Sequence, residues 1–296
     1  MRIGITGSSG LIGSALRQRL EIEGHEVRRF VRGKPDEPDA VWDPAGGWLR
    51  EDAMEGLDAI VHLAGESIGQ GRWTKSRKAA LRASRVDSTR LLVSHLERMT
   101  NPPALIAASA VGIYGSRGDE VLDEGSKGGT GFLAELTKEW EAEILHAERA
   151  GARTVILRLG VVLAPGKGAL SRMALPFKFG LGGRLGSGRQ WFSWVALDDV
   201  VSVILHAITS DMSGVYNVTA PTPVTNRELT KALAAVLRRP ALFAVPAFAL
   251  RTLLGEAADE LLLSSQRVIP RRLQEADFAF RYPEVAGALS AALKGS

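Results

Sequence analysis

Three glycines near the start of the chain carry the clearest chemical signal. Gly7, Gly10 and Gly13 follow one another at three-residue spacing, between an apolar run at residues 2–6 and a helical pattern from residue 11. The first glycine permits a tight turn, the second lets a phosphate approach the backbone, and the third lets the helix pack closely on the strand. A helix beginning there offers free N–H groups and its positive dipole end to an anion. The pattern favours a site for a dinucleotide pyrophosphate over an ordinary glycine-rich turn.

The end of the second expected strand, at residues 26–31, selects between cofactors. An acidic residue there would bond the ribose 2′-hydroxyl of NAD, whereas an arginine accommodates the 2′-phosphate of NADP. The chain reads Phe30-Val31-Arg32-Gly33-Lys34, with no acid. The guanidinium of Arg32 can pair with two phosphate oxygens, and Lys34 can assist. We therefore predict NADP; the alternative is that Arg32 is an ordinary surface residue.

A second pattern would support a different chemistry. Residues 65–69 read G-E-S-I-G, the spacing of a hydrolase nucleophile elbow, and Asp199 and His206 follow Ser67 in hydrolase order. An elbow needs a helix directly after the serine, but Gly69-Gln70-Gly71 follows here. We treat the match as a coincidence and keep a serine hydrolase as the third functional alternative.

The composition narrows the classes of protein. The chain has 296 residues, 45% of them hydrophobic and 24% charged, which is enough to fill the core of a large α/β domain with a smaller lobe. It has no cysteine, and no second histidine stands at ligand spacing from His62, so we expect no metal site. The net charge is +4, but the basic residues are dispersed, which argues against nucleic-acid binding. Without a visible secretory signal or an apolar stretch of about 18 residues, we expect a cytoplasmic protein that does not span a membrane.

Strands and helices alternate along the first half of the chain, which predicts a doubly wound parallel α/β sheet of the Rossmann type. We assign residues 1–165 to an NADP-binding domain, to which residues 195–220 return. Residues 166–194 and 221–296 should form a small mixed C-terminal lobe that binds the substrate. The expected strands lie at residues 2–6, 26–31, 40–42, 57–65, 104–109 and 154–162. The expected helices lie at residues 11–23, 73–96, 132–150, 199–208 and 227–237, with one or two across 246–263 and the last from residue 271.

Several blocks of sequence resemble the extended short-chain dehydrogenase/reductases of the nucleotide-sugar epimerase and dehydratase type. They are T-G-x-x-G-x-x-G at residues 6–13, D-x-x-V-H-L-A-G at 58–65, and the segments 109–115, 158–166 and 192–200. Further blocks at residues 63–66, 160–163, 176–183, 186–192, 217–221 and 266–270 resemble one branch, the epimerase family, whose bacterial members were labelled as resembling a cell-division inhibitor. The resemblance covers nearly the whole chain.

The resemblance implies NADP as the cofactor. It puts Val31 and Arg32 at the adenosine phosphate, Arg85 in contact with the cofactor, and Leu159 near the nicotinamide. The full set of expected cofactor residues is Gly7, Ser9, Gly10, Leu11, Ile12, Gly13, Val31, Arg32, Leu63, Ala64, Gly65, Arg85 and Leu159.

The catalytic residues of the resembled enzymes are incomplete in this chain. Those enzymes use a Tyr-x-x-x-Lys pair with a Ser or Thr, and the tyrosine moves a proton while the nicotinamide moves a hydride. None of the three tyrosines here has a lysine four residues on, and Phe132 or Leu133 stands where the tyrosine should be. Ser109, Tyr114 and Lys138 remain as catalytic candidates, although Ala110 fills the expected serine position and Lys138 is out of register.

For the substrate we expect Glu66, Arg189 and Trp191. Glu66 follows a strand tip and is a second candidate acid, while Arg189 and Trp191 could hold an anionic or ring-bearing substrate by pairing and stacking. The structural alternatives are a loop salt bridge for Glu66 and a loop anchor for Tyr114. The first function hypothesis is an NADP(H)-dependent oxidoreductase or epimerase acting on a small carbonyl, hydroxyl or nucleotide-sugar substrate. The second is a catalytically silent NADP(H)-sensing or scaffold protein, and either could form a homo-oligomer.

Overall fold

The computed structural model describes residues 1–32 and 39–294, and in this part of the chain eight strands form one central sheet. Their order is β13-β8-β6-β5-β1-β2-β3-β4, and neighbours pair in parallel except for β4, which is antiparallel to β3. The strand order reverses between β1 and β5, which confirms the predicted doubly wound sheet. The strands are β1 (Arg2–Thr6), β2 (Glu26–Val31), β3 (Ala40–Asp43), β4 (Trp48–Leu49), β5 (Ala59–His62), β6 (Ala104–Ala110), β8 (Thr154–Leu159) and β13 (Gly214–Val218).

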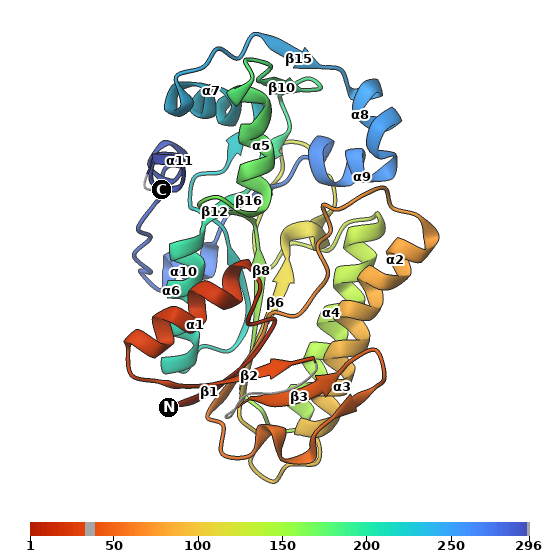
Figure 1. Cartoon of the computed structure of the whole chain (residues 1–296), viewed down its shortest axis with the longest axis vertical. Coiled ribbons are helices and arrows are strands. Elements are labelled where there is room, and N and C mark those ends of the chain that lie inside the picture. The colour runs from red at the N-terminus through yellow and green to blue at the C-terminus, as the bar shows by residue number, and fades with distance from the viewer. Residues whose placement is uncertain (33–38, 295–296) are drawn as a thin grey trace.

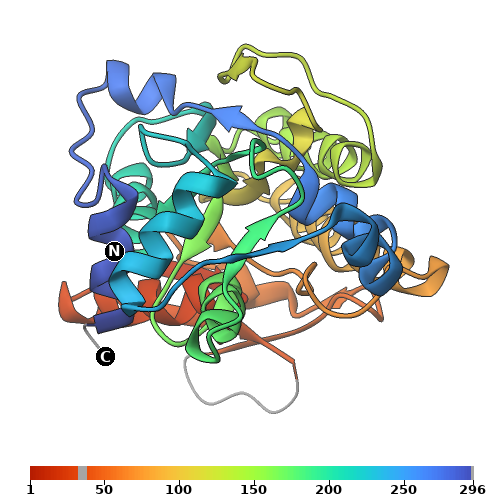
Figure 2. The ribbon, with the colours of Figure 1, turned by 90° about the horizontal axis from the view of Figure 1, so that it is seen from above.

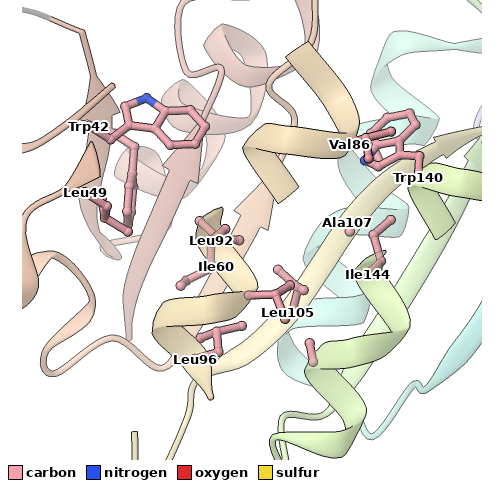
Figure 3. Packing of buried hydrophobic residues seen from close by; sticks show 14 of the residues in the cluster. Trp42, Leu49, Ile60, Val86, Leu92, Leu96, Leu105, Ala107, Trp140 and Ile144 are labelled. Carbon is pink, nitrogen blue, oxygen red and sulfur yellow. The ribbon is translucent and has the colours of Figure 1, made fainter. Parts of the chain in front are cut away.

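Helices cover both faces of this sheet (Figure 1). One face carries α1 (Leu11–Ile22), α6 (Leu197–Thr209) and α10 (Arg271–Glu275), and the other carries α2 (Lys75–Arg82), α3 (Ser88–Leu96) and α4 (Phe132–Arg149). Successive strand residues point to opposite faces, so Val61 packs towards α1 and α6, whereas Ile60 packs towards α3 and α4. Figure 3 shows this second core, in which Ile60 and Leu105 of the sheet lie among Leu92 and Ile144 of the helices.

Two elements expected to be continuous are interrupted. The helix expected at residues 73–96 consists of α2, a π-helical turn η2 (Ala83–Asp87) and α3. The strand expected at residues 154–162 ends at Leu159, and the chain leaves the sheet at Gly160, where an added Cβ would lie 2.9 Å from the carbonyl oxygen of Ser193. β9 (Val161–Leu163) then pairs with β12 (Trp194–Ala196) outside the central sheet.

The C-terminal lobe lies beyond the carboxyl ends of β6 and β8, at the top of Figure 1, and Figure 2 looks down onto it. Leu170, Ala174 and Phe177 form the buried face of a helix, α5, for which no prediction was made from the sequence. The last helix is α11 and not the one from residue 271, and residues 246–263 form three short helical pieces. The lobe contains α5 (Gly168–Lys178), β10 (Gly183–Leu185), β11 (Trp191–Phe192), β14 (Val224–Thr225), α7 (Asn226–Leu237), β15 (Phe243–Val245), α8 (Ala247–Leu254), α9 (Glu256–Ala258), η4 (Asp259–Leu263) and α11 (Val285–Lys294).

Four short elements complete the fold. β16 (Arg267–Val268) pairs in parallel with β7 (Val121–Leu122), and η3 (Val111–Tyr114) directly follows β6, while η1 (Glu51–Met54) precedes β5. None of the helices among the described residues has the length and apolar character needed to cross a membrane.

Candidate dinucleotide-binding site

The turn between β1 and α1 accepts only glycine at two positions. Gly7 has φ +67°, and a Cβ there would lie 2.8 Å from the backbone of Leu63, at the tip of β5. A Cβ on Gly13 would lie 2.2 Å from the carbonyl oxygen of Gly7. Since real Cβ atoms do not approach backbone atoms so closely, these glycines let the turn, the helix and the neighbouring strand tip pack backbone against backbone.

The N-terminus of α1 is open. Its N-cap is Gly10, which has no side chain to bond the first N–H groups, and the first turn contains no acidic residue. The N–H groups that begin an α-helix have no partner within the helix, and here no side chain of the described residues caps them. The turn therefore offers N–H groups and a positive dipole end to an anion, as a pyrophosphate site requires.

The expected cofactor residues lie in order along the carboxyl edge of the sheet. Val31 and Arg32 are at the end of β2, the glycine turn follows β1, Leu63 to Gly65 follow β5, and Leu159 ends β8. Ser9 belongs to the turn, and Leu11 and Ile12 to the first turn of α1. Arg32 is exposed, and Lys34 lies outside the described residues. This edge at a reversal of strand order is where open α/β sheets bind their ligands.

Arg85 reaches this edge from the π-helical turn η2. Its Nη2 donates to the carbonyl of Glu66 at 2.9 Å, and its Nη1 donates to the carbonyl of Leu81 at 3.2 Å. The guanidinium lies 5.4 Å from the ring centroid of Trp140 and packs against Gly65, where an added Cβ would be 3.3 Å from Cζ. Within the described part of the chain, no carboxylate lies at ion-pair distance from it, and burial first, then Arg77, lowers its pKa to about 10.

The catalytic candidates Ser109 and Tyr114 lie inside a buried polar network. Ser109 Oγ donates to Glu141 Oε1 at 2.5 Å, and Arg158 donates to both oxygens of Glu141 at 2.8 and 2.7 Å. Arg158 Nη1 also donates to the hydroxyl of Tyr114 at 2.9 Å, and that hydroxyl lies 2.8 Å from Asn217 Oδ1. Tyr114 is 0% exposed and Ser109 is 2% exposed. Both groups are therefore buried and already have partners within the protein.

The electrostatics of this network hold Tyr114 as a neutral phenol. Burial raises its pKa, and the neighbouring Arg158 only partly opposes that rise. Burial also disfavours the charge of Arg158, but its bonds to Glu141 outweigh that effect and raise its pKa. A base for catalysis near neutral pH needs the opposite shift for tyrosine, so this environment suits a structural role.

The first turn of α4, where the tyrosine of the resembled enzymes should stand, is closed by the C-terminal lobe. Glu260 of η4 accepts the N–H groups of Phe132 and Leu133 at 2.9 and 3.1 Å. The Phe132 ring packs edge-on against Trp73, with centroids 5.2 Å apart. Lys138 donates to the carbonyl of Gly129 at 2.7 Å and pairs with Glu135 at 2.8 Å.

The expected substrate residues fall into two groups. The carboxylate of Glu66 forms an ion pair with Arg77, which is the loop salt bridge considered above. Trp191 donates from Nε1 to Asp119 at 2.8 Å, and the guanidinium of Arg267 lies 4.4 Å from its ring centroid. The cation beside the Trp191 ring is thus Arg267, while Arg189 is exposed.

The hydrolase alternative is wrong. Residues 68–74 form loop and turn after Ser67, and the next helix begins only at Lys75. The carboxylate of Asp199 accepts the backbone N–H groups of Arg281 and Tyr282, and His206 lies beside Phe278 on α6. These three residues do not form a triad. No group of three or more histidine and acidic side chains among the described residues could hold a metal ion.

Four residues near the site were not expected from the sequence: Thr6, Thr89, Glu141 and Glu260. Thr6 Oγ1 accepts the N–H groups of Leu63 and Ala64 at 3.0 and 3.2 Å, which joins the tips of β1 and β5. The spacing of Glu141 on the buried face of α4 was a usable signal, because a buried acid needs a cation such as Arg158. Glu260 and two of the partners of Thr89, His62 and Trp140, lie far along the chain from the groups they bond, which left no local signal.

Comparisons with known proteins agree with this fold. The model of the NAD dependent epimerase/dehydratase family matches residues 3–219, and that of a domain of unknown function, DUF1731, matches residues 245–292. The chain is 44% identical over 290 residues to epimerase family protein ML0860 of Mycobacterium leprae, covering 97% of this chain and 94% of that protein. It is 35% identical over 294 residues to human epimerase family protein SDR39U1, covering 98% of each.

Two solved structures are similar over nearly the whole chain. The crystal structure of human epimerase family protein SDR39U1 with NADPH matches with a TM-score of 0.88 at 35% identity, covering 99% of both chains. UDP-glucose 4-epimerase of Thermus thermophilus, in complex with NAD, matches with a TM-score of 0.78 at 19% identity, covering 99% of this chain and 97% of that chain, which shows the shared fold alone. The chain belongs to the NAD-dependent epimerase/dehydratase family, in the branch of epimerase family proteins that carry a C-terminal DUF1731 domain.

Proposed function

We propose that this protein binds NADP(H) along the carboxyl edge of its sheet. The observation that carries the proposal is the glycine turn, whose backbone can meet a pyrophosphate while the N-terminus of α1 has no protein cap. The Gly7 and Gly13 positions have no room for a side chain, and Arg85 holds a positive charge beside the β5 tip. The NADPH in the crystal structure of a human relative at 35% identity supports the same cofactor.

The residues that would hold each part of the cofactor follow from their order on the sheet. The glycine turn binds the pyrophosphate, Arg32 binds the 2′-phosphate, and Leu159 lies beside the nicotinamide. NADPH supplies a hydride when bound. The protein supplies position and charge, because Arg85 balances the phosphates from a half-buried place.

We propose that the reaction is an oxidation–reduction or epimerisation of a small carbonyl, hydroxyl or nucleotide-sugar substrate. Trp191 and Arg267 form the candidate substrate contact, since a ring with a guanidinium over its face suits a planar or anionic group. Gln266 donates to the carbonyl of Val111 at 3.2 Å, which connects this pair to the end of β6. Within this proposal Ser109, Tyr114 and Lys138 support the fold, and water supplies the proton that completes a reduction or accepts the proton that an oxidation releases. The proposed location is the cytoplasm.

A catalytically silent NADP(H) sensor is the second candidate, and one observation favours it. Glu260 of the C-terminal lobe occupies the helix end from which the resembled enzymes present their tyrosine. Under this alternative the protein binds NADPH but turns over no carbonyl substrate. Steady-state oxidation of NADPH with a panel of aldehydes, ketones and nucleotide sugars separates the two candidates.

The test of cofactor binding is a fluorescence titration with NADPH and with NADH. We expect NADPH to bind at least tenfold more tightly, about 1.4 kcal/mol, and Arg32→Asp to remove that preference. Arg98→Asp is the matched control, because Arg98 is also exposed but follows α3, away from the glycine turn. Equal affinity for the two cofactors would contradict the role of Arg32, and no binding of either would contradict the proposed function.

A further inference from the structure

We propose that Thr89 is a positioning residue for the cofactor site. It fixes the backbone of Arg85 directly and the tip of β5 through His62, in the geometry that receives the cofactor. The proposal rests on the proposed function, since it concerns the same NADP(H) site. Its basis is a chain of buried hydrogen bonds that runs from the end of β1 to the π-helical turn.

The first half of this link joins β1 to β5. Thr6 Oγ1 accepts the N–H groups of Leu63 and Ala64, so its own proton is left to donate to His62 Nδ1, 2.7 Å away. His62 therefore carries its proton on Nε2 and donates it to Thr89 Oγ1 at 2.9 Å. Burial lowers the pKa of His62 to about 4, which keeps the ring neutral and able to accept from Thr6.

The second half joins β5 to the π-helical turn. Thr89 Oγ1 accepts from His62 and from Trp140 Nε1, 2.9 Å away, and donates to the carbonyl of Arg85 at 2.6 Å. Its single proton and its two lone pairs are then all used. Because Thr6, His62 and Thr89 are each 0% exposed, solvent does not compete for these bonds in the folded protein.

The π-helical turn explains why Arg85 needs this support. Such a turn displaces backbone carbonyls from the regular helical bonding pattern, and turns of this kind are frequent at functional sites. Here side-chain hydroxyls bond two carbonyls of the turn. Ser88 Oγ donates to the carbonyl of Ser84 at 2.8 Å and lies 3.1 Å from that of Arg85, while Thr89 makes the shorter bond to Arg85. The backbone carbonyl of Arg85 is thus fixed by hydrogen bonds, and its side chain extends to the carbonyl of Glu66, just past the β5 tip.

Both ends of this chain of hydrogen bonds lie beside residues that we expect to contact the cofactor. One end holds the N–H groups of Leu63 and Ala64 against the glycine turn, and the other holds a guanidinium beside Gly65. Among the described residues that guanidinium has no ion-pair partner, so its charge is available to an anionic ligand.

The experiment is a double-mutant cycle on NADPH affinity, with fluorescence titration of Thr89→Val, Arg85→Met and the double variant. Valine keeps the shape of threonine but removes the hydroxyl, and we expect it to weaken NADPH binding about tenfold. If Thr89 acts through Arg85, the double variant binds no more weakly than Arg85→Met alone. Thr89→Ser, which keeps the hydroxyl, should restore the affinity of the natural protein.

The outcomes separate this proposal from the proposed function. If the two single effects multiply in the double variant, or if Thr89→Val lowers the melting temperature without changing the dissociation constant, Thr89 is only structural. If the natural protein does not bind NADPH, the proposed function fails and the positioning role falls with it. Should Thr89→Val not fold, His62→Asn carries the same cycle, because its amide oxygen can accept from Thr6 but its side chain is too short to reach Thr89.

Discussion

Two helices begin near the carboxyl edge of the sheet, and their N-termini differ. The first N–H groups of α1 follow a glycine and are bonded by no side chain of the described residues, whereas Glu260 bonds those of α4. An open helix N-terminus favours an external anion, while a carboxylate from the protein satisfies it internally. The N-terminus of α1, at the cofactor side of the site, is therefore free to bind an anion. The N-terminus of α4, where the resembled enzymes place their tyrosine, is covered by Glu260 of the C-terminal lobe.

The arginines of the two regions show the same difference. Arg85 at the cofactor end has no carboxylate partner in the described part of the chain, and burial lowers its pKa. Arg158 at the closed end is paired with Glu141 through two bonds. A buried charge with its partner serves the fold, and removing that partner is costly. Substitutions in the closed region should therefore change stability, and substitutions in the open region should change NADPH affinity.

The largest effect on stability should come from Glu141→Gln. It leaves the charge of Arg158 buried and uncompensated, which we expect to cost about 3–5 kcal/mol and to lower Tm by roughly 10 °C. The control is Glu143→Gln on the same helix, which removes only a surface pair with Arg90 and should cost less than about 1 kcal/mol. Differential scanning calorimetry measures both. Equal losses of stability in the two variants would show that the buried ion pair contributes no more than the surface pair.

The next largest effect is the pH dependence due to His62. Its pKa is about 4 in the folded protein against 6.5 ordinarily, so the unfolded chain binds the extra proton between these values. Stability should fall as the pH drops from about 6.5 to about 4 and then level off, by about 3 kcal/mol in total. Urea unfolding of the natural protein and of His62→Asn across this range isolates the contribution. Parallel curves for the two proteins would contradict it.

A smaller loss of stability, but a large loss of binding, should follow Gly13→Ala. The new Cβ would lie 2.2 Å from the Gly7 carbonyl oxygen, so the turn must shift, at about 2–3 kcal/mol. We expect NADPH binding to be lost, as measured by titration. Gly287→Ala is the control, because Gly287 also lies within a helix, α11, but its added Cβ would meet only the ring of Tyr282, at an ordinary contact distance of 3.9 Å. Retained NADPH affinity in Gly13→Ala would show that the cofactor does not use this turn.

The smallest effect should come from Tyr114→Phe. Losing the hydroxyl removes a buried hydrogen-bond partner of Arg158 and Asn217, at about 1–2 kcal/mol. NADPH affinity and any turnover found with a carbonyl panel should stay unchanged in steady-state assays below the melting temperature. A turnover that disappears while NADPH still binds would return Tyr114 to a catalytic role.

The parts of the fold that the sequence predicted are those with local signals. The glycine spacing, the apolar strands and the missing acid after residue 31 each depend on neighbouring residues. The burial of Tyr114 depends on Asn217, and the cap of α4 depends on Glu260, each more than a hundred residues away. The π-helical turn was missed because a helical period continues across it, and only the hydroxyls of Ser88 and Thr89 distinguish it.

The most direct test of the contrast between the two regions is the rise in Tm produced by NADPH. A ligand at a hundred times its dissociation constant stabilises a protein by about 2.7 kcal/mol, which corresponds to a rise of several degrees. We predict this rise in the natural protein and in Glu141→Gln, although the latter starts from a lower Tm, and a much smaller rise in Arg85→Met. The absence of any rise in the natural protein, or its loss in Glu141→Gln to the same extent as in Arg85→Met, would contradict the division into an open cofactor region and a closed structural one.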